Sequence, residues 1–438
     1  MSRITVLKIT TFALTILSSA TVNASWSPPE AKWVDDFNRS TVLFPSGNVA
    51  TVWGSIRRAP SMILEPKPTI QHFRVKGFRA PGVPARVSPL RFEGKPVRAP
   101  LVVFLTGLFG AIDDPVAASM ISILQEAGNH VVALPNPWST SYQSAGPEAL
   151  PGAIEDESRV LLEVIEQVRK KLGSSRISTI SLVGVSYGSF LATKTAEIDS
   201  RSYSPLIDGI TSVLSPPLQF SDALKQMDLG IEGIKSQEEG CRALRDAYLA
   251  FRYFIARRES DLKRQERDCA DYLLFGNFHN SLVELALQLH ETRGIGTLPA
   301  AGAAREVWKR RLNFSSFIQE FLKPKEGQTL INEQKFPSLT EIIASLPEEQ
   351  RRSRYRILAA KDDFLNRMES WNDLKTSGLL PQDSILLMNW GGHFGYSALE
   401  NFQSFAQKAF QGNYGCEDLD MPECHPIDAD LLFTKKRK

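Results

Sequence analysis

Short apolar runs alternate with longer amphipathic stretches in two separate parts of the chain. Residues 101–105 form a continuous apolar run, as expected of a strand that is covered on both faces. Further runs predict strands at residues 131–134, 177–183, 210–214, 356–360 and 384–388. Residues 71–75 and 83–87 predict a first pair of strands ahead of them. Strands that alternate with helices predict an α/β fold with a mostly parallel, doubly wound sheet.

Capping residues indicate where the intervening helices begin and end. Asp114 and Pro115 predict the start of a helix that ends at Gly128. The next helix has acids in its first turn and bases in its last, which complements the helix dipole. Its apolar stripe has a spacing of four: Val160, Val164, Val168 and Leu172.

The alternation of strands and helices stops at residues 218–350, which are charged and helical in pattern. We interpret this segment as a large helical cap inserted between two parts of one core, residues 71–217 and 351–412. Both junctions open at the carboxyl end of the sheet, where the chemistry of such folds occurs. Cap aromatics, among them Phe275, Phe278 and those in residues 244–254, are expected to pack the cap and to line part of a pocket.

Segments outside the core complete the predicted organisation. Residues 25–70 are rich in Pro, Trp and turn formers, which predicts an N-terminal extension packed on the core. Residues 413–438 form a cysteine-containing tail. Residues 1–24 resemble a signal peptide, with a basic start, a short apolar run and small residues before Ser25. An uncleaved N-terminal anchor is the alternative.

The pentapeptide Gly184-Val185-Ser186-Tyr187-Gly188 is the strongest chemical signal in the chain. It matches G-x-S-x-G, follows the strand predicted at residues 177–183 and precedes a helical pattern at residues 189–198. Strand, sharp turn and helix are the context of a nucleophile elbow, which pushes the serine hydroxyl into a cleft. A glycine-rich turn whose serine caps the helix is the alternative. The flanking pattern favours Ser186 as a catalytic nucleophile.

A serine nucleophile needs a histidine base, and the base needs an orienting carboxylate. In hydrolases with this elbow the chain order is serine, acid, histidine. His393 is the candidate base, because it follows the strand predicted at residues 384–388 and has glycines on both sides. The other histidines after Ser186 lie in the cap or the tail: His279, His290 and His425.

Two adjacent acids, Asp362 and Asp363, end the strand predicted at residues 356–360. The usual spacing of a small residue, two further residues and the acid selects Asp363 when counted from Ala360, and Asp362 when counted from Ala359. Asp363 is favoured and Asp362 stays the alternative. For the oxyanion, backbone N–H groups are needed. The candidates are Tyr187, after the nucleophile, and Leu108, in the loop that follows residues 101–105.

These motifs together resemble the α/β-hydrolase superfamily, and within it the YheT-like hydrolases. The resemblance rests on Gly107-Leu108, the elbow, Asp362-Asp363-Phe364 and Gly391-Gly392-His393-Phe394-Gly395. Residues 48–53, followed by Arg57-Arg58, are also similar to the N-terminal segment of that family. The resemblance covers about residues 45–215 and 355–410 and implies an α/β-hydrolase fold with a Ser-Asp-His triad. The family usually has His where this chain has Thr106, so the substrate is not carried over.

Composition and charge narrow the class of partner. The net charge of +2 is close to neutral, which gives no indication of nucleic-acid binding, and no partner protein is indicated. The four cysteines suggest disulfides in an exported protein, and the local pairs, Cys241–Cys269 and Cys416–Cys424, close the shortest loops. No spacing typical of a metal site is present, and no cofactor is indicated.

The sequence therefore predicts a periplasmic or secreted serine hydrolase that cleaves small-molecule or lipid carboxylic esters, in the manner of a carboxylesterase or lipase. An amidase or peptidase with the same triad is one alternative. A non-catalytic binding protein with a hydrolase fold is another, although a complete triad argues against it.

Overall fold

The computed structural model describes residues 28–39, 46–56, 70–92, 95–237, 241, 269–322, 336–398 and 400–411. Several sequence predictions lie outside these residues: the signal peptide at 1–24, Arg57-Arg58, the aromatic stretch at 244–254 and the tail with Cys416 and Cys424. Among the described helices, none has the length and apolar character needed to cross a membrane.

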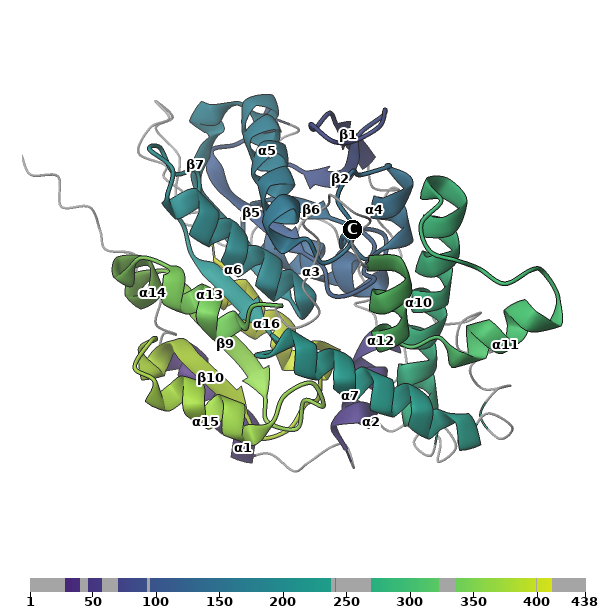
Figure 1. The fold of residues 1–438 in the computed structure, drawn as a ribbon. Coiled ribbons are helices and arrows are strands. Elements are labelled where there is room, and N and C mark those ends of the chain that lie inside the picture. The colour runs from purple at the N-terminus through teal and green to yellow at the C-terminus, as the bar shows by residue number, and fades with distance from the viewer. Residues whose placement is uncertain are drawn as a thin grey trace, which may run out of the picture.

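An eight-stranded sheet forms the centre of the molecule (Figure 1), in the order β1-β2-β6-β5-β7-β8-β9-β10. Its strands are β1 Ile70–Phe73, β2 Val83–Ser88, β5 Ala99–Leu105, β6 His130–Leu134, β7 Ile177–Val185, β8 Thr211–Leu214, β9 Tyr355–Ala360 and β10 Ile385–Met388. β2 pairs antiparallel with β1 and β6, and all pairs from β6 to β10 are parallel. A separate hairpin joins β3 Arg91–Phe92 to β4 Lys95–Pro96. The predicted strands and their mostly parallel arrangement are confirmed.

Helices cover both faces of this sheet. α3 Pro115–Glu126 packs on β5 and β6 and contacts α16 Glu400–Ala409, which in turn contacts α1 Pro28–Arg39. The other face carries α5 Ile154–Leu172 and α6 Tyr187–Ser200, with α13 Leu339–Ser345 against α6. The remaining helices are α2 Gly47–Ile56, α4 Thr140–Ser144, α7 Phe220–Gly233, α10 Ala270–Arg293, α11 Ala303–Arg311, α12 Phe314–Phe317, α14 Glu348–Ser353 and α15 Met368–Thr376.

Capping and charged residues mark the ends of two of these helices. The Asp114 side chain accepts a hydrogen bond from the N–H of Val116 at 2.8 Å, with Pro115 in the first turn of α3, as predicted. α5 has the expected acids in its first turn and bases in its last, and ends at Gly173. Val164, Val168 and Leu172 are buried, whereas Val160 is half-exposed. Residues four apart in a helix are rotated by about 40° more than one full turn. The predicted stripe therefore leaves the buried face at one end.

The strand order reverses at β5, which pairs with β6 on one side and β7 on the other. In doubly wound sheets a crevice opens outside the carboxyl ends of the strands at such a reversal. Leu105 is in register with Gly184, so the loop after β5 and the turn after β7 leave the sheet side by side. The topology thus brings residues 106–110 next to Ser186.

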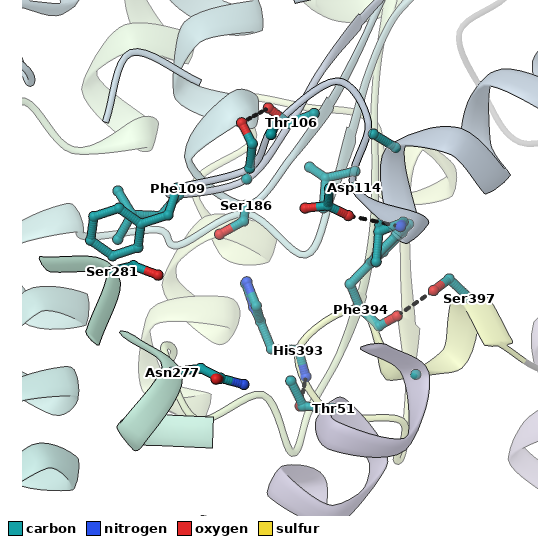
Figure 2. A pocket seen from close by; sticks show the side chains of 18 of the residues that line it. Thr51, Thr106, Phe109, Asp114, Ser186, Asn277, Ser281, His393, Phe394 and Ser397 are labelled. Atoms are coloured by element: carbon teal, nitrogen blue, oxygen red, sulfur yellow. Dashed lines mark hydrogen bonds between the residues drawn. The ribbon is translucent and has the colours of Figure 1, made fainter. Parts of the chain in front are cut away.

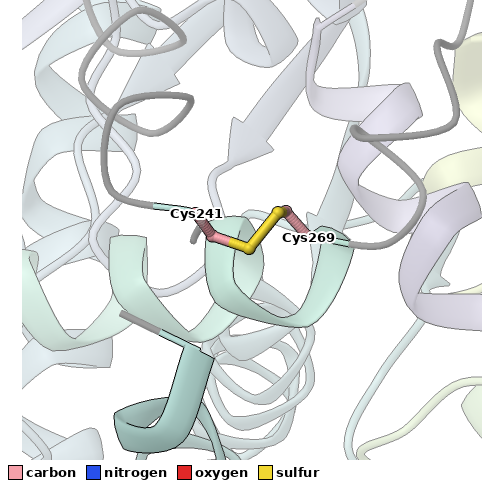
Figure 3. The surroundings of a disulfide bond; sticks show 2 residues. All are labelled: Cys241 and Cys269. Carbon is pink, nitrogen blue, oxygen red and sulfur yellow. A yellow bond between two sulfur atoms is a disulfide. The ribbon is translucent and has the colours of Figure 1, made fainter. Parts of the chain in front are cut away.

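The described parts of residues 218–350 are largely helical. α10 packs against α2, α4 and α7, while α13 packs on α6, which itself contacts β7 and β8. Cys241 is bonded to Cys269 immediately before α10 (Figure 3), which is one of the two local pairs expected. The role of residues 218–350 as one cap stays a prediction.

Candidate active site

Ser186 lies between the last residue of β7 and the first residue of α6. Its φ of 55° and ψ of −124° are strained for a residue with a side chain. The flanking glycines make the turn possible: a Cβ on Gly184 would collide with the Gly188 carbonyl, and one on Gly188 with the Leu105 carbonyl. The backbone therefore has the geometry of a nucleophile elbow.

His393 lies in a tight loop after β10, and its ring points toward the Ser186 side chain (Figure 2). Gly391, Gly392 and Phe394 around it have positive φ angles of 132°, 61° and 61°. The His393 Nδ1 atom lies 2.8 Å from Asp363 Oδ2. Because a carboxylate only accepts hydrogen bonds, Nδ1 presents its proton to Asp363, and in the neutral ring Nε2 then carries the lone pair.

The two adjacent acids have different partners. Asp363 is buried, contacts the His393 ring with one oxygen and accepts the Leu365 N–H with the other at 3.0 Å. Asp362 instead accepts backbone N–H groups of the histidine loop, from Gly391 at 3.2 Å and Gly392 at 2.8 Å. Burial raises the pKa of Asp362, and these two hydrogen bonds oppose the rise. Of the pair, Asp363 has the geometry of an orienting acid.

The loop after β5 borders Ser186 directly, since a Cβ on Gly107 would lie 3.1 Å from the Ser186 Cβ. The Gly110 N–H donates to the Gly107 carbonyl at 2.9 Å, which closes a turn without using the Leu108 N–H. The Thr106 hydroxyl donates to the Gly110 carbonyl at 3.1 Å and stiffens the same turn.

Tyr187 is the first residue of α6, where helix N–H groups have no partner within the helix and the dipole favours negative charge. Leu108 and Tyr187 thus occupy the two positions from which oxyanion donors are expected, on either side of Ser186.

A cavity of about 320 Å³ opens in front of Ser186 and His393. Its walls come from the β5 loop, the start of α3, the histidine loop, α2 and α10. α10 contributes Leu274, Asn277, Phe278 and Ser281. Phe278 had been expected as a cap aromatic, whereas Asn277, Ser281 and the α2 residues were not anticipated. The spacing of the four α10 residues places them on one helix face, which is a signal the sequence did contain.

Phe275, which the sequence indicated together with Phe278, packs against Phe364 with ring centroids 5.4 Å apart. It is buried and does not line the cavity, so it holds α10 on the core. Within the described ranges, no group of three or more His, Cys, Asp or Glu side chains could hold a metal ion.

A buried acid, Glu157, forms a hydrogen bond with Tyr187, the residue that follows the nucleophile. The Tyr187 hydroxyl donates to Glu157 Oε2 at 2.7 Å, and the Gly152 N–H donates to Glu157 Oε1 at 2.7 Å. Burial raises the pKa of Glu157 to about 7, although both hydrogen bonds oppose the rise. Burial, together with the charge of Glu157, also raises the pKa of Tyr187 well above its ordinary value.

The strand order, the elbow after β7 and the histidine loop after the last strand define the fold. The chain has the α/β-hydrolase fold. No protein-family model matches the chain, and comparison with curated proteins finds no significant sequence relative.

Among solved structures, the chain matches VinJ at 15% identity over 78% of this chain and 97% of that chain, with a TM-score of 0.39. An arylesterase is 12% identical over 88% of this chain and 97% of its own, with a TM-score of 0.41. A thermostable carboxyl esterase from Bacillus coagulans is 12% identical over 79% and 97%, with a TM-score of 0.40. Similarity at this level says nothing about substrate or mechanism.

Proposed function

We propose that this protein is a serine hydrolase that cleaves carboxylic esters through an acyl-enzyme intermediate. The observation that carries the proposal is the contact of 2.8 Å between His393 Nδ1 and Asp363, with the ring directed at a serine on a strained elbow. Three groups with these separate roles, contributed by three different loops, have no evident structural purpose together.

The reaction follows from the position of each group. The His393 Nε2 atom removes the proton of the Ser186 hydroxyl while Ser186 Oγ attacks the ester carbonyl carbon. Asp363 keeps the ring in the required tautomer and stabilises the imidazolium that forms. The N–H groups of Leu108 and Tyr187 hold the oxyanion of the tetrahedral intermediate. His393 then donates its proton to the leaving alcohol, and the acyl group remains on Ser186.

A water molecule completes the cycle. His393 takes a proton from this water, the resulting hydroxide attacks the acyl carbon, and the proton returns to Ser186 as the acid leaves. These steps use only side chains and backbone groups of this chain, and they call for neither a metal nor an organic cofactor.

The lining of the cavity supports a small or medium acyl or alcohol group. Leu108, Phe109, Leu274 and Phe278 supply an apolar surface, and Asn277 and Ser281 supply hydrogen-bonding groups opposite Ser186. Apolar walls combined with polar groups near the reacting atoms are typical of small-molecule sites. A small-molecule or lipid ester is therefore the proposed substrate class.

We further propose that the protein is exported to the periplasm or secreted. The signal-like pattern of residues 1–24 motivates this proposal, and the bond between Cys241 and Cys269 supports it, because disulfides persist in oxidising compartments. The motif Asp362-Asp363-Phe364 and the motif at residues 391–395 support the YheT-like hydrolases as the proposed subfamily. An N-terminus near Ser25 in the mass spectrum of the native protein would support export, and an intact Met1 would contradict it.

Fluorophosphonate labelling and hydrolysis of a series of p-nitrophenyl esters test the proposed activity. We expect the wild-type protein to label once and to hydrolyse esters, and Ser186→Ala to lose both, with a fall in kcat of about a thousandfold or more. Ser200→Ala, at the far end of α6, is the matched control and should behave as wild type.

Three outcomes would contradict the proposal in different ways. Retention of labelling and turnover in Ser186→Ala would exclude this nucleophile. Faster cleavage of matched anilides than of esters would indicate an amidase or peptidase. A wild-type protein that neither labels nor turns over any ester or amide would indicate a binding protein.

A further inference from the structure

The loop that carries His393 is held by side chains at four consecutive backbone N–H groups. Gly391 and Gly392 donate to Asp362, His393 donates to Thr51 Oγ1 at 2.8 Å, and Phe394 donates to Ser215 Oγ at 3.0 Å. Asp362 follows β9, Ser215 follows β8, and Thr51 belongs to α2. A segment from outside the sheet therefore binds the backbone of the candidate base itself.

The Thr51 hydroxyl has one proton, and the structure shows where it goes. It donates to the Gly47 carbonyl one helical turn earlier at 2.8 Å, so its lone pair is turned toward the His393 N–H. The residue is buried, with 8% of its surface exposed. A buried N–H that loses its acceptor costs free energy. The bond from the His393 N–H therefore stabilises the position of the loop relative to Thr51.

The backbones of α2 and the histidine loop approach each other closely at three points. A Cβ on Gly392 would collide with the Gly47 carbonyl, and one on Gly395 with the Ala50 carbonyl. A Cβ on Gly54 would lie 2.6 Å from the Gly395 Cα. The two backbones can approach in this way only because glycine stands at each contact.

α2 is also fixed on its other side. The Asn48 side chain donates to Asp271 Oδ1 at 2.8 Å, which ties α2 to the first turn of α10. Thr51, Val52 and Gly54 line the same cavity as Ser186. α2 is thus placed between α10 and the histidine loop, and it completes one wall of the cavity.

We infer that Thr51 is a positioning residue for His393. We also infer that α2, which precedes the sheet in the chain, completes the active site. This inference rests on the proposed function. The ring of His393 must meet Asp363 with one nitrogen and Ser186 with the other, so a small rotation of the loop backbone would impair both contacts at once. A displacement of about 1 Å at a catalytic group can lower the rate about a hundredfold.

The test compares Thr51→Val with Thr51→Ser. Valine keeps the shape of threonine but removes the acceptor, whereas serine keeps the hydroxyl. We expect Thr51→Val to lower kcat by about tenfold to a hundredfold with KM changed by less than about threefold, because the reacting groups are misplaced while the pocket stays intact. Thr51→Ser should recover most of the lost rate.

Thr195→Val is the matched control. Thr195 is fully buried in α6, and its hydroxyl makes the same type of bond to the carbonyl four residues earlier, Leu191, at 2.6 Å. It lies about two turns beyond the elbow, and the bond of its hydroxyl stays within α6. Its substitution removes a buried hydroxyl and the bond to the preceding turn without unpairing a backbone N–H, so it should leave kcat unchanged.

A proton NMR signal separates this inference from the proposed function. In protein with ¹⁵N-labelled histidine, the Nδ1 proton shared by His393 and Asp363 should give a far-downfield resonance that His393→Gln removes. We expect Thr51→Val to shift or broaden this resonance, and Thr51→Ser and Thr195→Val to leave it in place.

The outcomes are distinguishable. A wild-type protein without ester hydrolysis contradicts the proposed function, and the resonance then decides the positioning role alone. An unchanged resonance in Thr51→Val overturns the inference, as does a kcat within about twofold of wild type in an active enzyme. A loss of activity shared equally by Thr51→Val and Thr195→Val would show a general effect on folding and would also overturn it.

Discussion

Glu157 gives the prediction whose magnitude can be worked out most fully from the structure. This side chain lies in the first turn of α5, fully enclosed, with the Tyr187 hydroxyl and the Gly152 N–H as its two hydrogen-bond donors. Burial raises its pKa to about 7 from an ordinary value of 4.5. The nearby charge of Asp156 adds a smaller contribution in the same direction.

A raised pKa in the folded state means that stability falls as the pH rises. Below pH 4.5 both states hold the proton and Glu157 has no effect. Between 4.5 and about 7 the folded state holds a proton that the unfolded state has released, so each step upward in pH favours unfolding. Above about 7 the cost is complete, and a shift of this size corresponds to roughly 3 kcal/mol.

Glu157→Gln removes this titration. The amide is neutral at every pH but offers only one acceptor to two donors, so it carries a constant penalty that does not vary with pH. We therefore expect the free energy of unfolding of Glu157→Gln to rise relative to that of wild type by about 2 to 3 kcal/mol between pH 5 and pH 8.5. Denaturant unfolding at several pH values in this interval measures the difference.

Glu155→Gln is the control on the same helix turn. Glu155 is exposed, and its hydrogen bond with Arg159 lowers its pKa, so it does not titrate in this interval. Its pH profile should run parallel to that of wild type. Parallel profiles for Glu157→Gln and wild type would refute the reasoning, because Glu157 would then be ionised throughout.

Three further predictions concern the site and its supports. Asp363→Asn should lower kcat/KM by about a thousandfold or more, and Asp362→Asn by less than about tenfold, since only Asp363 contacts the His393 ring; equal losses would contradict this assignment. Phe278→Ala should shift the preferred p-nitrophenyl ester toward longer acyl chains by about tenfold in kcat/KM, and an unaltered chain-length profile would place selectivity elsewhere. Replacing both Cys241 and Cys269 by Ser should lower the free energy of unfolding by about 3.5 kcal/mol, because the bond closes a loop of 28 residues; unchanged stability would argue that the bond is not formed in the native protein.

Local signals in the sequence accounted for the strands of the sheet, for the helices that begin at Pro115 and Ile154, and for the candidate nucleophile. The elbow could be found because strand, glycine, serine, glycine and helix are contiguous, and the close approach that excludes a Cβ at Gly184 and Gly188 is a contact between near neighbours. Capping at Asp114 and the charged ends of α5 are likewise effects within one turn of the chain. Such signals can be recognised in the sequence without knowledge of the fold.

The choice between Asp362 and Asp363 shows where that reasoning stops. The two residues are adjacent and of the same type, and the spacing rule gave a preference without excluding either. In the folded chain one carboxylate reaches the His393 ring and the other the backbone of the same loop. The direction of each side chain at the end of β9 decides which acid contacts the histidine ring. This direction cannot be read from composition or spacing.

The sequence by itself determined the class of fold, the order of the sheet strands along the chain, and the residue types that could form a Ser-Asp-His arrangement. The tertiary structure alone decided which acid faces His393, which α10 residues line the cavity, and that α2 supports the base. Thr51 and His393 are 342 positions apart, and a contact at that separation depends on how α2 packs after the sheet has formed. Backbone conformation follows from near neighbours, whereas an active site is assembled by contacts between distant segments, which only the packing of the whole chain specifies.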